Sequence, residues 1–357
     1  MRILLLTRYG PLGASSRLRA YQYLPYLRSQ GFEITPMPLL GDYYQEDLYA
    51  GRSRRWGRIA WAYLRRLLAL GQSRAFDLLW IEYELFPWFP ATAERLLARV
   101  RTPFLVDYDD PIYHRYELHG SRLVRLLLAD KIDMVMRRAT AVTVGNDYLG
   151  ERARAAGARC VEYLPTVVDL ERYRTDPPFG GGPFTIGWIG SPSTARYLVP
   201  LAPMLANFCQ ARGARLVVVG PRDVRLDHVP LELKPWSEVT EVADILGFDV
   251  GIMPLPDDPW ERGKCGYKLI QYMACARPVI ASPIGANRQI VEHGVNGFLA
   301  TTDEDWRSAL DMLYAAPELR ARLGRAGRQK VETSYCTQVT APRLASLLKM
   351  APSAHRA

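Results

Sequence analysis

Apolar and polar positions in the first half of the chain follow two alternating patterns. Short, continuous apolar runs predict buried strands, and stretches with apolar residues three or four positions apart predict helices. The strand-like runs are 2–7, 33–38, 77–82, 103–108 and 139–144. The predicted helices are a segment from Ser15 or Ser16 to Gly31, followed by 56–70, 91–100 and 121–138. Strands that alternate with helices in this way predict βαβ units and a parallel sheet.

The same alternation starts again after residue 183. Strands are predicted at 184–189, 215–219, 248–253 and 278–282, and helices at 194–211, 267–275 and from Asp303 onward. Between the two series, the eight residues 176–183 include three prolines and three glycines, which predicts a linker. We therefore expect a first domain at 1–175 and a second at 184–334. A C-terminal helix at about 335–357 is expected to pack back on the first domain.

Two open parallel sheets in tandem predict an α/β fold of two doubly wound, Rossmann-like domains that face a cleft. Such sheets bind ligands at the carboxyl ends of their strands, where helix N-termini offer unpaired N–H groups to anions. A cleft between two such domains is a common place for a substrate. The pattern predicts a protein that binds a phosphorylated ligand, but it does not name a reaction.

The composition is that of a soluble globular protein, with 48% hydrophobic and 23% charged residues, which excludes general disorder. No apolar run approaches the roughly 18 residues of a membrane span. Arg8 interrupts the first apolar run too early for a signal peptide. The five cysteines are scattered and form no CxxC pair. They argue against a disulfide framework and a structural zinc site, and they suit a reducing cytosol.

Most of the positive charge lies in the first half. Residues 1–174 hold 26 Lys and Arg against 19 Asp and Glu, so they carry +7 of the net charge of +9. Within them, residues 52–74 contain seven arginines and no acids, interspersed with tryptophans and leucines. Apolar residues on one helix face and arginines on the other fit an interfacial helix on a membrane. The alternatives are polyanion binding and an ordinary amphipathic helix packed on the sheet with solvated arginines.

The arginines proposed to contact an acceptor or a membrane are Arg54, Arg55, Arg58, Arg65 and Arg66. No helix-turn-helix, zinc-finger or RNP-like signature supports nucleic acid as a partner.

One block of the second domain carries a family resemblance. Residues 263–299 read GKCGYKLIQYMACARPVIASPIGANRQIVEHGVNGFL. This block resembles the donor-binding region of the retaining GT-B glycosyltransferases of family 4, with "YMA" ending a helix, then "PVIA", a glycine turn and "GVNGFL". Two further segments resemble the family in the same order, PTVVDLERY at 165–173 and GWIGSPSTARY at 187–197. The resemblance implies a GT-B fold and retaining transfer of a sugar from a nucleotide sugar.

The sequence departs from the family in the residues that hold the nucleotide. The family has two glutamates in an E-x7-E pattern, and the aligned residues here are Gly263 and Gln271. Two lysines, Lys264 and Lys268, stand in this loop instead. Lys268 begins a helix, where the macrodipole favours anions. We therefore expect Lys268, Lys264 and the nearby backbone N–H groups to hold a diphosphate.

A second departure follows the first strand of the second domain. Ser191 stands where the family has an arginine that clamps the diphosphate, and Arg196 stands where it has a lysine. The structural alternatives are a plain βα turn for Gly13 and a solvated helix lysine for Lys268. The complete set of expected donor-binding residues is Gly13, Gly190, Ser191, Arg196, Lys264, Cys265, Gly266, Tyr267, Lys268, Gln271 and Asn287.

Acidic residues follow two strands of the first domain. Asp109 and Asp110 come at the end of the strand at 103–108, and the resemblance aligns them with a His-Asp pair near the anomeric carbon. Carboxylates there suit acceptor positioning, oxocarbenium stabilisation or general base catalysis. The alternative is a helix cap or a salt-bridged pair. Glu82 and Glu84 either reach the cleft or lie on a surface loop.

We expect a retaining glycosyltransferase of the hexosyltransferase type that acts on a glycan or lipid-linked acceptor. Its pathway is expected to be synthesis of bacterial cell-surface polysaccharides or glycoconjugates. No cofactor and no metal are expected. The expected location is cytoplasmic, either free or peripheral on the inner face of the plasma membrane. Two alternatives remain open: a nucleotide-sugar epimerase of GT-B type, and a non-catalytic protein that binds a nucleotide sugar or a glycan.

Overall fold

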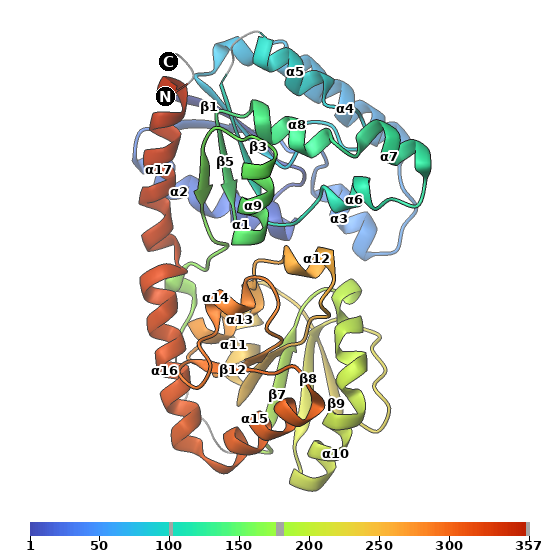
Figure 1. Cartoon of the computed structure of the whole chain (residues 1–357), viewed down its shortest axis with the longest axis vertical. Coiled ribbons are helices and arrows are strands. Elements are labelled where there is room, and N and C mark those ends of the chain that lie inside the picture. Colours follow the sequence, from blue (N-terminus) through green and yellow to red (C-terminus); the bar gives the residue numbers. More distant parts are fainter. Residues whose placement is uncertain (100–102, 176–181, 355–357) are drawn as a thin grey trace. The chain divides into compact units, whose positions relative to one another are not determined.

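The computed structural model describes residues 1–99, 103–175 and 182–354, and these form two compact units (Figure 1). Unit 1 comprises Met1–Thr166 and the chain from Thr340 onward. Unit 2 comprises Val167–Val339. Most of the predicted linker, residues 176–181, lies outside the described residues.

The division between the units lies nearer the N-terminus than the predicted linker. The segment after Thr166 is bonded into unit 2, where Val168 forms a parallel β-bridge with Cys336. The Tyr173 carbonyl accepts a hydrogen bond from Arg328 at 2.9 Å, and the Tyr173 hydroxyl donates to Glu241 at 2.9 Å. Residues 167–173 therefore belong with the second sheet, although the sequence pattern assigned them to the first.

Unit 1 is built on a parallel sheet whose described strands run in the order β2-β1-β3-β4-β5-β6. They are β1 (Arg2–Leu6), β2 (Glu33–Pro36), β3 (Leu78–Glu82), β4 (Phe104–Tyr108), β5 (Ala141–Val144) and β6 (Val161–Tyr163). The first five match the predicted apolar runs, and β1, β3, β4 and β5 are almost wholly buried, as a central strand covered on both faces requires. β6 was not predicted because this edge strand is short and partly exposed.

The helices of unit 1 lie on both faces of its sheet (Figure 1). They are α1 (Ala14–Arg19), the 3₁₀ turn η1 (Tyr21–Tyr23), α2 (Leu24–Ser29), α3 (Asp42–Tyr49), α4 (Trp56–Leu70), η2 (Ser73–Ala75), α5 (Thr92–Arg99), α6 (His114–Glu117), α7 (Arg122–Leu128), α8 (Lys131–Arg138) and α9 (Asp147–Ala155). The single helix expected up to Gly31 is instead α1, η1 and α2. Pro25 has no N–H to donate to the Tyr21 carbonyl, so the α-helical ladder is interrupted there.

The last helix, α17 (Thr337–Ala354), returns to unit 1. The Thr340 hydroxyl lies 3.0 Å from the hydroxyl of Tyr23, and Arg343 donates to the carbonyl of Tyr163 at 2.9 Å. Leu344 and Leu348 are fully buried. Unit 1 is therefore assembled from two separate parts of the sequence.

Unit 2 is also built on a parallel sheet, whose described strands run in the order β12-β11-β10-β7-β8-β9. They are β7 (Thr185–Ile189), β8 (Arg215–Gly220), β9 (Leu231–Pro235), β10 (Val250–Met253), β11 (Val279–Ala281) and β12 (Gly297–Leu299). Counted within the unit, this is the 3-2-1-4-5-6 order of dinucleotide-binding domains. The edge strands β9 and β12 were not predicted.

The helical elements of unit 2 are η3 (Leu170–Arg172), η4 (Pro192–Leu201), α10 (Ala202–Arg212), α11 (Glu241–Leu246), α12 (Pro259–Arg262), α13 (Tyr267–Ala274), α14 (Asn287–Ile290), α15 (Asp303–Ala315) and α16 (Pro317–Ser334). The single helix expected at 194–211 is a 3₁₀ segment followed by α10. Pro200 lies inside the 3₁₀ segment, where it cannot donate an i→i−4 bond.

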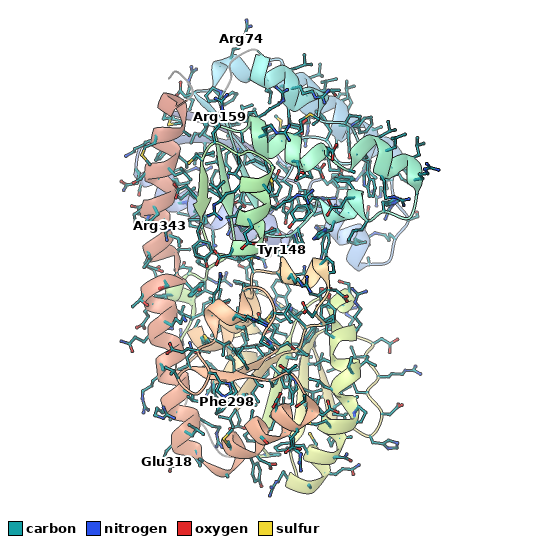
Figure 2. All side chains as sticks on the ribbon, in the orientation of Figure 1. Arg74, Tyr148, Arg159, Phe298, Glu318 and Arg343 are labelled. Atoms are coloured by element: carbon teal, nitrogen blue, oxygen red, sulfur yellow. The ribbon has the colours of Figure 1, made fainter. Side chains whose placement is uncertain are left out.

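Side chains fill the space between each sheet and its helices (Figure 2). Phe298 lies in the interior of unit 2, whereas Glu318 points outward at the start of α16. The largest buried side chains include Trp80 in unit 1 and Trp188 and Trp306 in unit 2. The two doubly wound parallel sheets predicted from the sequence are confirmed. The predicted cleft between them stays a prediction.

Candidate functional site

Each sheet has a point where the strand order reverses direction, and a ligand crevice is expected at such a point. In unit 1 it lies between β1 and β3, and in unit 2 between β7 and β10. The residues that follow these strands are therefore the candidates for contact with a ligand.

At the unit 1 reversal, Glu82 ends β3 and ties down the loop that follows β1. Its carboxylate accepts hydrogen bonds from the Ser16 hydroxyl at 2.6 Å and from the Arg8 backbone N–H at 2.8 Å. Ser16 in turn accepts from the Tyr9 N–H at 3.1 Å. Burial raises the pKa of Glu82 to about 7. Glu82 is thus a buried anchor for this loop, and its placement on a surface loop is wrong.

Gly13 lies in the same loop and directly precedes α1. A Cβ at Gly13 would stand 2.5 Å from the Cβ of Tyr9. This position therefore needs glycine for packing within the loop. Its expected contact with a donor stays a prediction.

The aspartates at the end of β4 have different surroundings. Asp107 is buried and forms two hydrogen bonds with Arg19, at 2.6 and 2.8 Å, and it accepts a third from Thr143 at 2.5 Å. Asp109 is also buried and accepts a hydrogen bond from the hydroxyl of Tyr83. Burial, reinforced by the neighbouring Asp110, raises the pKa of Asp109 to about 6. Asp107 is a structural carboxylate, and Asp109 and Asp110 stay the catalytic candidates.

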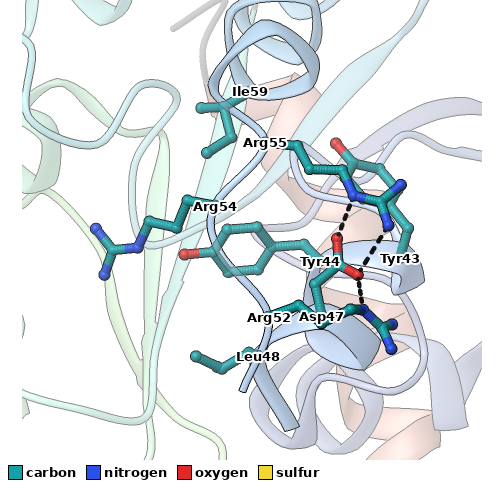
Figure 3. A pocket seen from close by; sticks show the side chains of 8 residues that line it. All are labelled: Tyr43, Tyr44, Asp47, Leu48, Arg52, Arg54, Arg55 and Ile59. Carbon is teal, nitrogen blue, oxygen red and sulfur yellow. Dashed lines mark hydrogen bonds and ion pairs between the residues drawn. The ribbon is translucent and has the colours of Figure 1, made fainter. Parts of the chain in front are cut away.

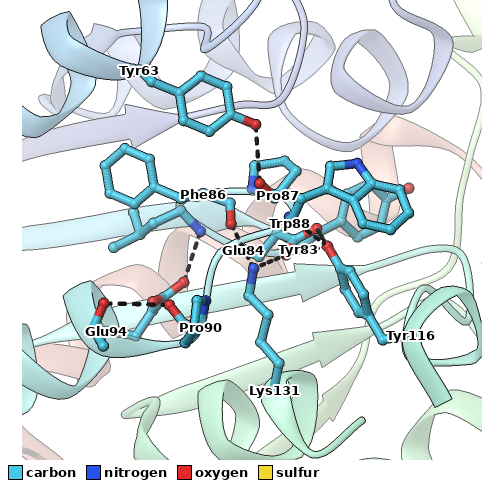
Figure 4. Close-up of polar contacts among 12 residues, drawn as sticks. Tyr63, Tyr83, Glu84, Phe86, Pro87, Trp88, Pro90, Glu94, Tyr116 and Lys131 are labelled. Atoms are coloured by element: carbon cyan, nitrogen blue, oxygen red, sulfur yellow. Dashed lines mark hydrogen bonds and ion pairs between the residues drawn. The ribbon is translucent and has the colours of Figure 1, made fainter. Parts of the chain in front are cut away.

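Glu84 does not lie on a surface loop either (Figure 4). It is buried, forms an ion pair with Lys131, and accepts from the Tyr116 hydroxyl at 2.8 Å. Lys131 also donates to the carbonyl of Phe86 at 2.6 Å. Removing one partner of a buried ion pair would leave the other as an uncompensated buried charge. Glu84 therefore holds the segment after β3 in place.

Sequence reasoning missed a polar cluster that follows β4 and β5. His114 in α6 contacts the Glu117 carboxylate at 2.5 Å through Nδ1 and the Tyr148 hydroxyl at 2.9 Å through Nε2. Arg152 joins Glu117 to Asp133 at 2.8 and 2.7 Å. Burial lowers the pKa of His114. These residues are far apart in the sequence, so only the parallel arrangement of β4 and β5 could have brought them to attention.

α4 presents part of its apolar surface outward. Trp61, Leu64 and Leu68 are 62%, 45% and 61% exposed, and the exposed arginines Arg58 and Arg65 lie on the same helical stripe. The expectation that arginines occupy the opposite face is therefore wrong. The inward side of α4 carries Ala62, Ile59 and Tyr63, which pack with the buried Leu39 and Leu40.

Arg66 must be removed from the set of acceptor or membrane contacts. It is 1% exposed and donates to the carbonyls of Thr7, Met37 and Leu85. Its guanidinium therefore hydrogen-bonds backbone carbonyls that follow β1, β2 and β3 beneath α4. Burial lowers the pKa of Arg66, and the negative charge of the nearby Glu82 partly opposes this shift.

At the unit 2 reversal, the structure brings Gly190 and Lys268 together. A Cβ at Gly190 would lie 2.7 Å from the Cε of Lys268 and 2.5 Å from the Trp188 ring. The ammonium group of Lys268 lies 5.2 Å from the centroid of that ring. The glycine therefore makes room for the lysine stem, and the half-buried ammonium group lies near the carboxyl end of β7.

The loop before α13 is shaped by a glycine. Gly266 has φ +67°, and a Cβ there would lie 2.3 Å from the side chain of Ile290. Cys265 is buried, whereas Tyr267 and Lys264 are half-buried. The ammonium group of Lys264 lies 5.5 Å from the centroid of the Trp260 ring. The predicted loop residues thus surround the start of one helix.

Arg196 is held near this loop by an acid that sequence reasoning passed over. Glu261 in α12 is buried, accepts a hydrogen bond from Tyr197, and lies 3.8 Å from the guanidinium of Arg196. Arg196 itself is exposed. The neighbouring Ser191 is also exposed, and its hydroxyl lies 3.0 Å from Ser193 and 3.2 Å from Thr194.

Gln271 and Asn287 lie deeper than the sequence suggested. Gln271 is buried, and its amide donates to the Tyr173 hydroxyl at 3.0 Å. The Asn287 amide donates to the Ser282 carbonyl at 3.0 Å, and its own buried oxygen has no partner among the described residues. Their expected roles with a donor stay predictions.

Among residues 1–99, 103–175 and 182–354, no group of three or more His, Cys, Asp and Glu is arranged to hold a metal ion. In the same described part of the chain, no helix has the length and hydropathy needed to cross a membrane.

A known protein family matches most of unit 2. The model of the family described as "Glycosyl transferases group 1" matches residues 183–316, which include β7, the Gly190 loop and α13. Together with the two Rossmann-like units, this match supports a glycosyltransferase of GT-B fold. Assignment to family 4 and the retaining mechanism stay predictions.

Particular known proteins share parts of the sequence or the fold. A D-inositol 3-phosphate glycosyltransferase of Pseudarthrobacter chlorophenolicus is 28% identical over 126 residues, which are 35% of this chain and 29% of that protein. Sucrose-phosphate synthase from Thermosynechococcus elongatus is similar in structure, with a TM-score of 0.70, 14% identity and 98% of each chain covered. Anabaena HepE in complex with UDP and glucose has a TM-score of 0.69 and 16% identity, over 98% of this chain and 99% of HepE. The structural likenesses show the GT-B fold.

Proposed function

We propose that this protein transfers a sugar from a nucleoside diphosphate sugar to an acceptor, with retention at the anomeric carbon. The observation that carries the proposal is the placement of Lys268 over Gly190 at the strand-order reversal of unit 2. The match of the glycosyltransferase group 1 model over 183–316 supports it. So does the HepE structure, whose nucleotide is UDP and whose sugar is glucose.

The proposed chemistry is mainly electrostatic. Lys268 and the exposed Arg196 stabilise the leaving diphosphate, and the backbone N–H groups at the start of α13 add further donors. Lys268 has a pre-formed position because its Cε lies against Gly190 and its ammonium group lies 5.2 Å from the centroid of the Trp188 ring. In the retaining reaction the donor phosphate takes the proton of the acceptor hydroxyl. Asp109 and Asp110 place negative charge near the developing positive sugar.

We further propose that the acceptor is a glycan or a lipid-linked glycan used for the bacterial cell surface. The exposed apolar residues of α4 support this, because Trp61, Leu64 and Leu68 share the outer surface of the helix with Arg58 and Arg65. Such a face inserts its apolar side chains among acyl chains while the arginines contact anionic head groups. The protein then works as a cytoplasmic enzyme that is peripheral to the membrane, without a metal or another cofactor.

The test begins with calorimetric titration of the full chain with UDP, GDP, ADP, dTDP and CMP, each without metal. One nucleoside diphosphate should bind. Lys268→Met, which keeps a stem over Gly190 but removes the charge, should weaken that binding at least tenfold. Lys330→Ala, on α16 of the same unit, is the control and should change the affinity less than twofold. Equal affinities of Lys268→Met and the control would remove the phosphate role from Lys268.

Product analysis then separates the remaining functions. Sugar transferred to an acceptor with retained configuration supports the proposal. Release of an epimerised sugar nucleotide without acceptor would replace it with an epimerase. A folded protein that binds no nucleotide would leave the glycan-binding alternative.

A further inference from the structure

A small pocket lies between α3 and the beginning of α4 in unit 1 (Figure 3). It encloses about 80 Å³ and is lined by Tyr43, Tyr44, Asp47, Leu48, Arg52, Arg54, Arg55 and Ile59. A single water needs roughly 15 Å³ measured in this way, so the pocket has room for a group of several heavy atoms. None of the roles described for Glu82, Asp109 or Lys268 involves it.

The pocket is rich in arginine but has one internal acid. Asp47 lies 2.6 Å from the Nε of Arg52 and 3.0 Å from the Nε of Arg55. Three lining arginines against one aspartate leave a formal charge of +2. Arg54 extends away from the Asp47 cluster in Figure 3, and it forms no ion pair with any residue in the described part of the chain. The pocket thus has an excess of positive charge.

The arginines are oriented as well as concentrated. Asp47 is 10% exposed in its side chain, while Arg52 and Arg55 are 52% and 46% exposed. A guanidinium has five N–H donors, so a single shared carboxylate leaves most donors of this pair available to other acceptors. Their planar forks match the geometry of phosphate oxygens. The internal acid therefore fixes the arginines without neutralising the pocket.

The tyrosines connect the pocket to the candidate site at the strand ends. The ring of Tyr44 stacks on Tyr9, with centroids 6.0 Å apart and planes 20° apart. Tyr9 belongs to the loop after β1, and the Leu12 N–H of that loop donates to Asp42 of α3 at 3.2 Å. One wall of the pocket therefore continues into the loop that Glu82 anchors. A flat aromatic wall beside cationic groups suits a ring with an attached anion.

We propose that this pocket binds a phosphate group carried by the acceptor. The proposal rests on the proposed glycosyltransferase function and assigns Arg52, Arg54 and Arg55 to the acceptor rather than to the membrane in general. The phosphate belongs either to a soluble phosphorylated sugar or to a lipid-borne phosphate. In both cases the arginines hold the phosphate oxygens, and the attached group lies along Tyr43 and Tyr44.

Two probes distinguish these sources. The full chain is titrated with glucose 6-phosphate, and its binding to phosphatidylcholine vesicles is measured with and without phosphatidylglycerol. Lys268→Met serves as the background for the titrations, so that the phosphate of the probe is not held in unit 2. We compare Arg54→Ala/Arg55→Ala with Arg65→Ala/Arg74→Ala, which removes the same charge from exposed arginines that do not line the pocket. Arg28→Ala, which removes an exposed arginine of α2, is the general control.

The expected result is at least a tenfold loss of glucose 6-phosphate affinity in Arg54→Ala/Arg55→Ala and less than a twofold change in the other two variants. If the phosphate is lipid-borne, the same variant should lose at least three times more vesicle binding than Arg65→Ala/Arg74→Ala. Equal behaviour of the two double variants toward both probes overturns the proposal. Nucleoside diphosphate binding without the Lys268→Met change tests the proposed function separately. If the nucleoside diphosphate binds but the pocket test fails, only the proposal of phosphate binding in the pocket is rejected.

Discussion

The candidate acids of unit 1 and the candidate cations of unit 2 differ in burial and in accessibility. In unit 1 the carboxylates of Glu82, Asp107 and Asp109 are buried and already accept hydrogen bonds within the unit. In unit 2 the cations Lys268 and Arg196 are half-buried or exposed, over a floor that a glycine keeps open. The acids form a rigid, desolvated group, whereas the cations remain accessible to an anion from solution. The comparison predicts that unit 1 substitutions alter stability and turnover, while unit 2 substitutions alter nucleotide affinity.

The largest effect should come from breaking the buried ion pair of unit 1. Arg19→Ala leaves Asp107, which is 2% exposed, without its charged partner. Loss of one partner of a buried pair costs about 3–5 kcal/mol of unfolding free energy. Urea unfolding of Arg19→Ala and of the exposed control Arg28→Ala measures the difference. If the two variants are equally stable, the acids of unit 1 are not held as tightly as the comparison assumes.

The next effect concerns pH and Glu82. Its pKa is about 7 in the folded protein and 4.5 in its ordinary state, so between these values the folded state binds more protons. The contribution of Glu82 to the free energy of unfolding is therefore fully present below pH 4.5. It is lost as the pH rises through 7. The shift corresponds to about 3 kcal/mol. Unfolding at pH 5 and pH 8 should show a smaller loss in Glu82→Gln than in the wild type. An identical pH dependence would show that Glu82 ionises normally.

A smaller effect should separate turnover from binding at Asp109. Asp109→Asn keeps an acceptor for Tyr83 but removes the charge, so turnover should fall about 100-fold, or about 2.7 kcal/mol. Nucleotide affinity should change less than twofold, because the nucleotide is assigned to unit 2. Hydrolysis of the donor in the absence of acceptor measures turnover, and calorimetry measures affinity.

Asp130→Asn, an exposed aspartate before α8, is the matched control for this comparison. A parallel fall in affinity and turnover in Asp109→Asn would contradict the division of roles between the two units.

The central parts of the fold could be predicted from the sequence because both faces of a central parallel strand are buried. The apolar runs of β1, β3, β4 and β7 therefore stand out. The edge strands β6, β9 and β12 were missed, since each is short or partly exposed and has no such run. The division at Thr166 also escaped prediction, because pairing of Val168 with Cys336 is a contact between distant parts of the sequence.

The candidate site was predictable where one short segment supplies it. Lys264, Gly266 and Lys268 come from one loop and helix start, and the structure places them together. Which individual side chains are buried could not be predicted from the same sequence pattern. Arg66 and Arg65 are neighbours in a basic helix, yet one is 1% exposed and the other is exposed, which depends on the carbonyls that lie beneath α4.

The return of the chain to unit 1 at Thr340 has a consequence for biosynthesis. A ribosome completes every strand of the first sheet before it begins β7, but the residues that meet Tyr23 and Tyr163 are made only after the whole of unit 2. Domains emerging from the ribosome generally fold as units, with the N-terminal one first. In this protein unit 2 is the first to have its full sequence. At that stage unit 1 still lacks the part of α17 from Thr340 onward, and it exposes the surface that Leu344 and Leu348 later bury.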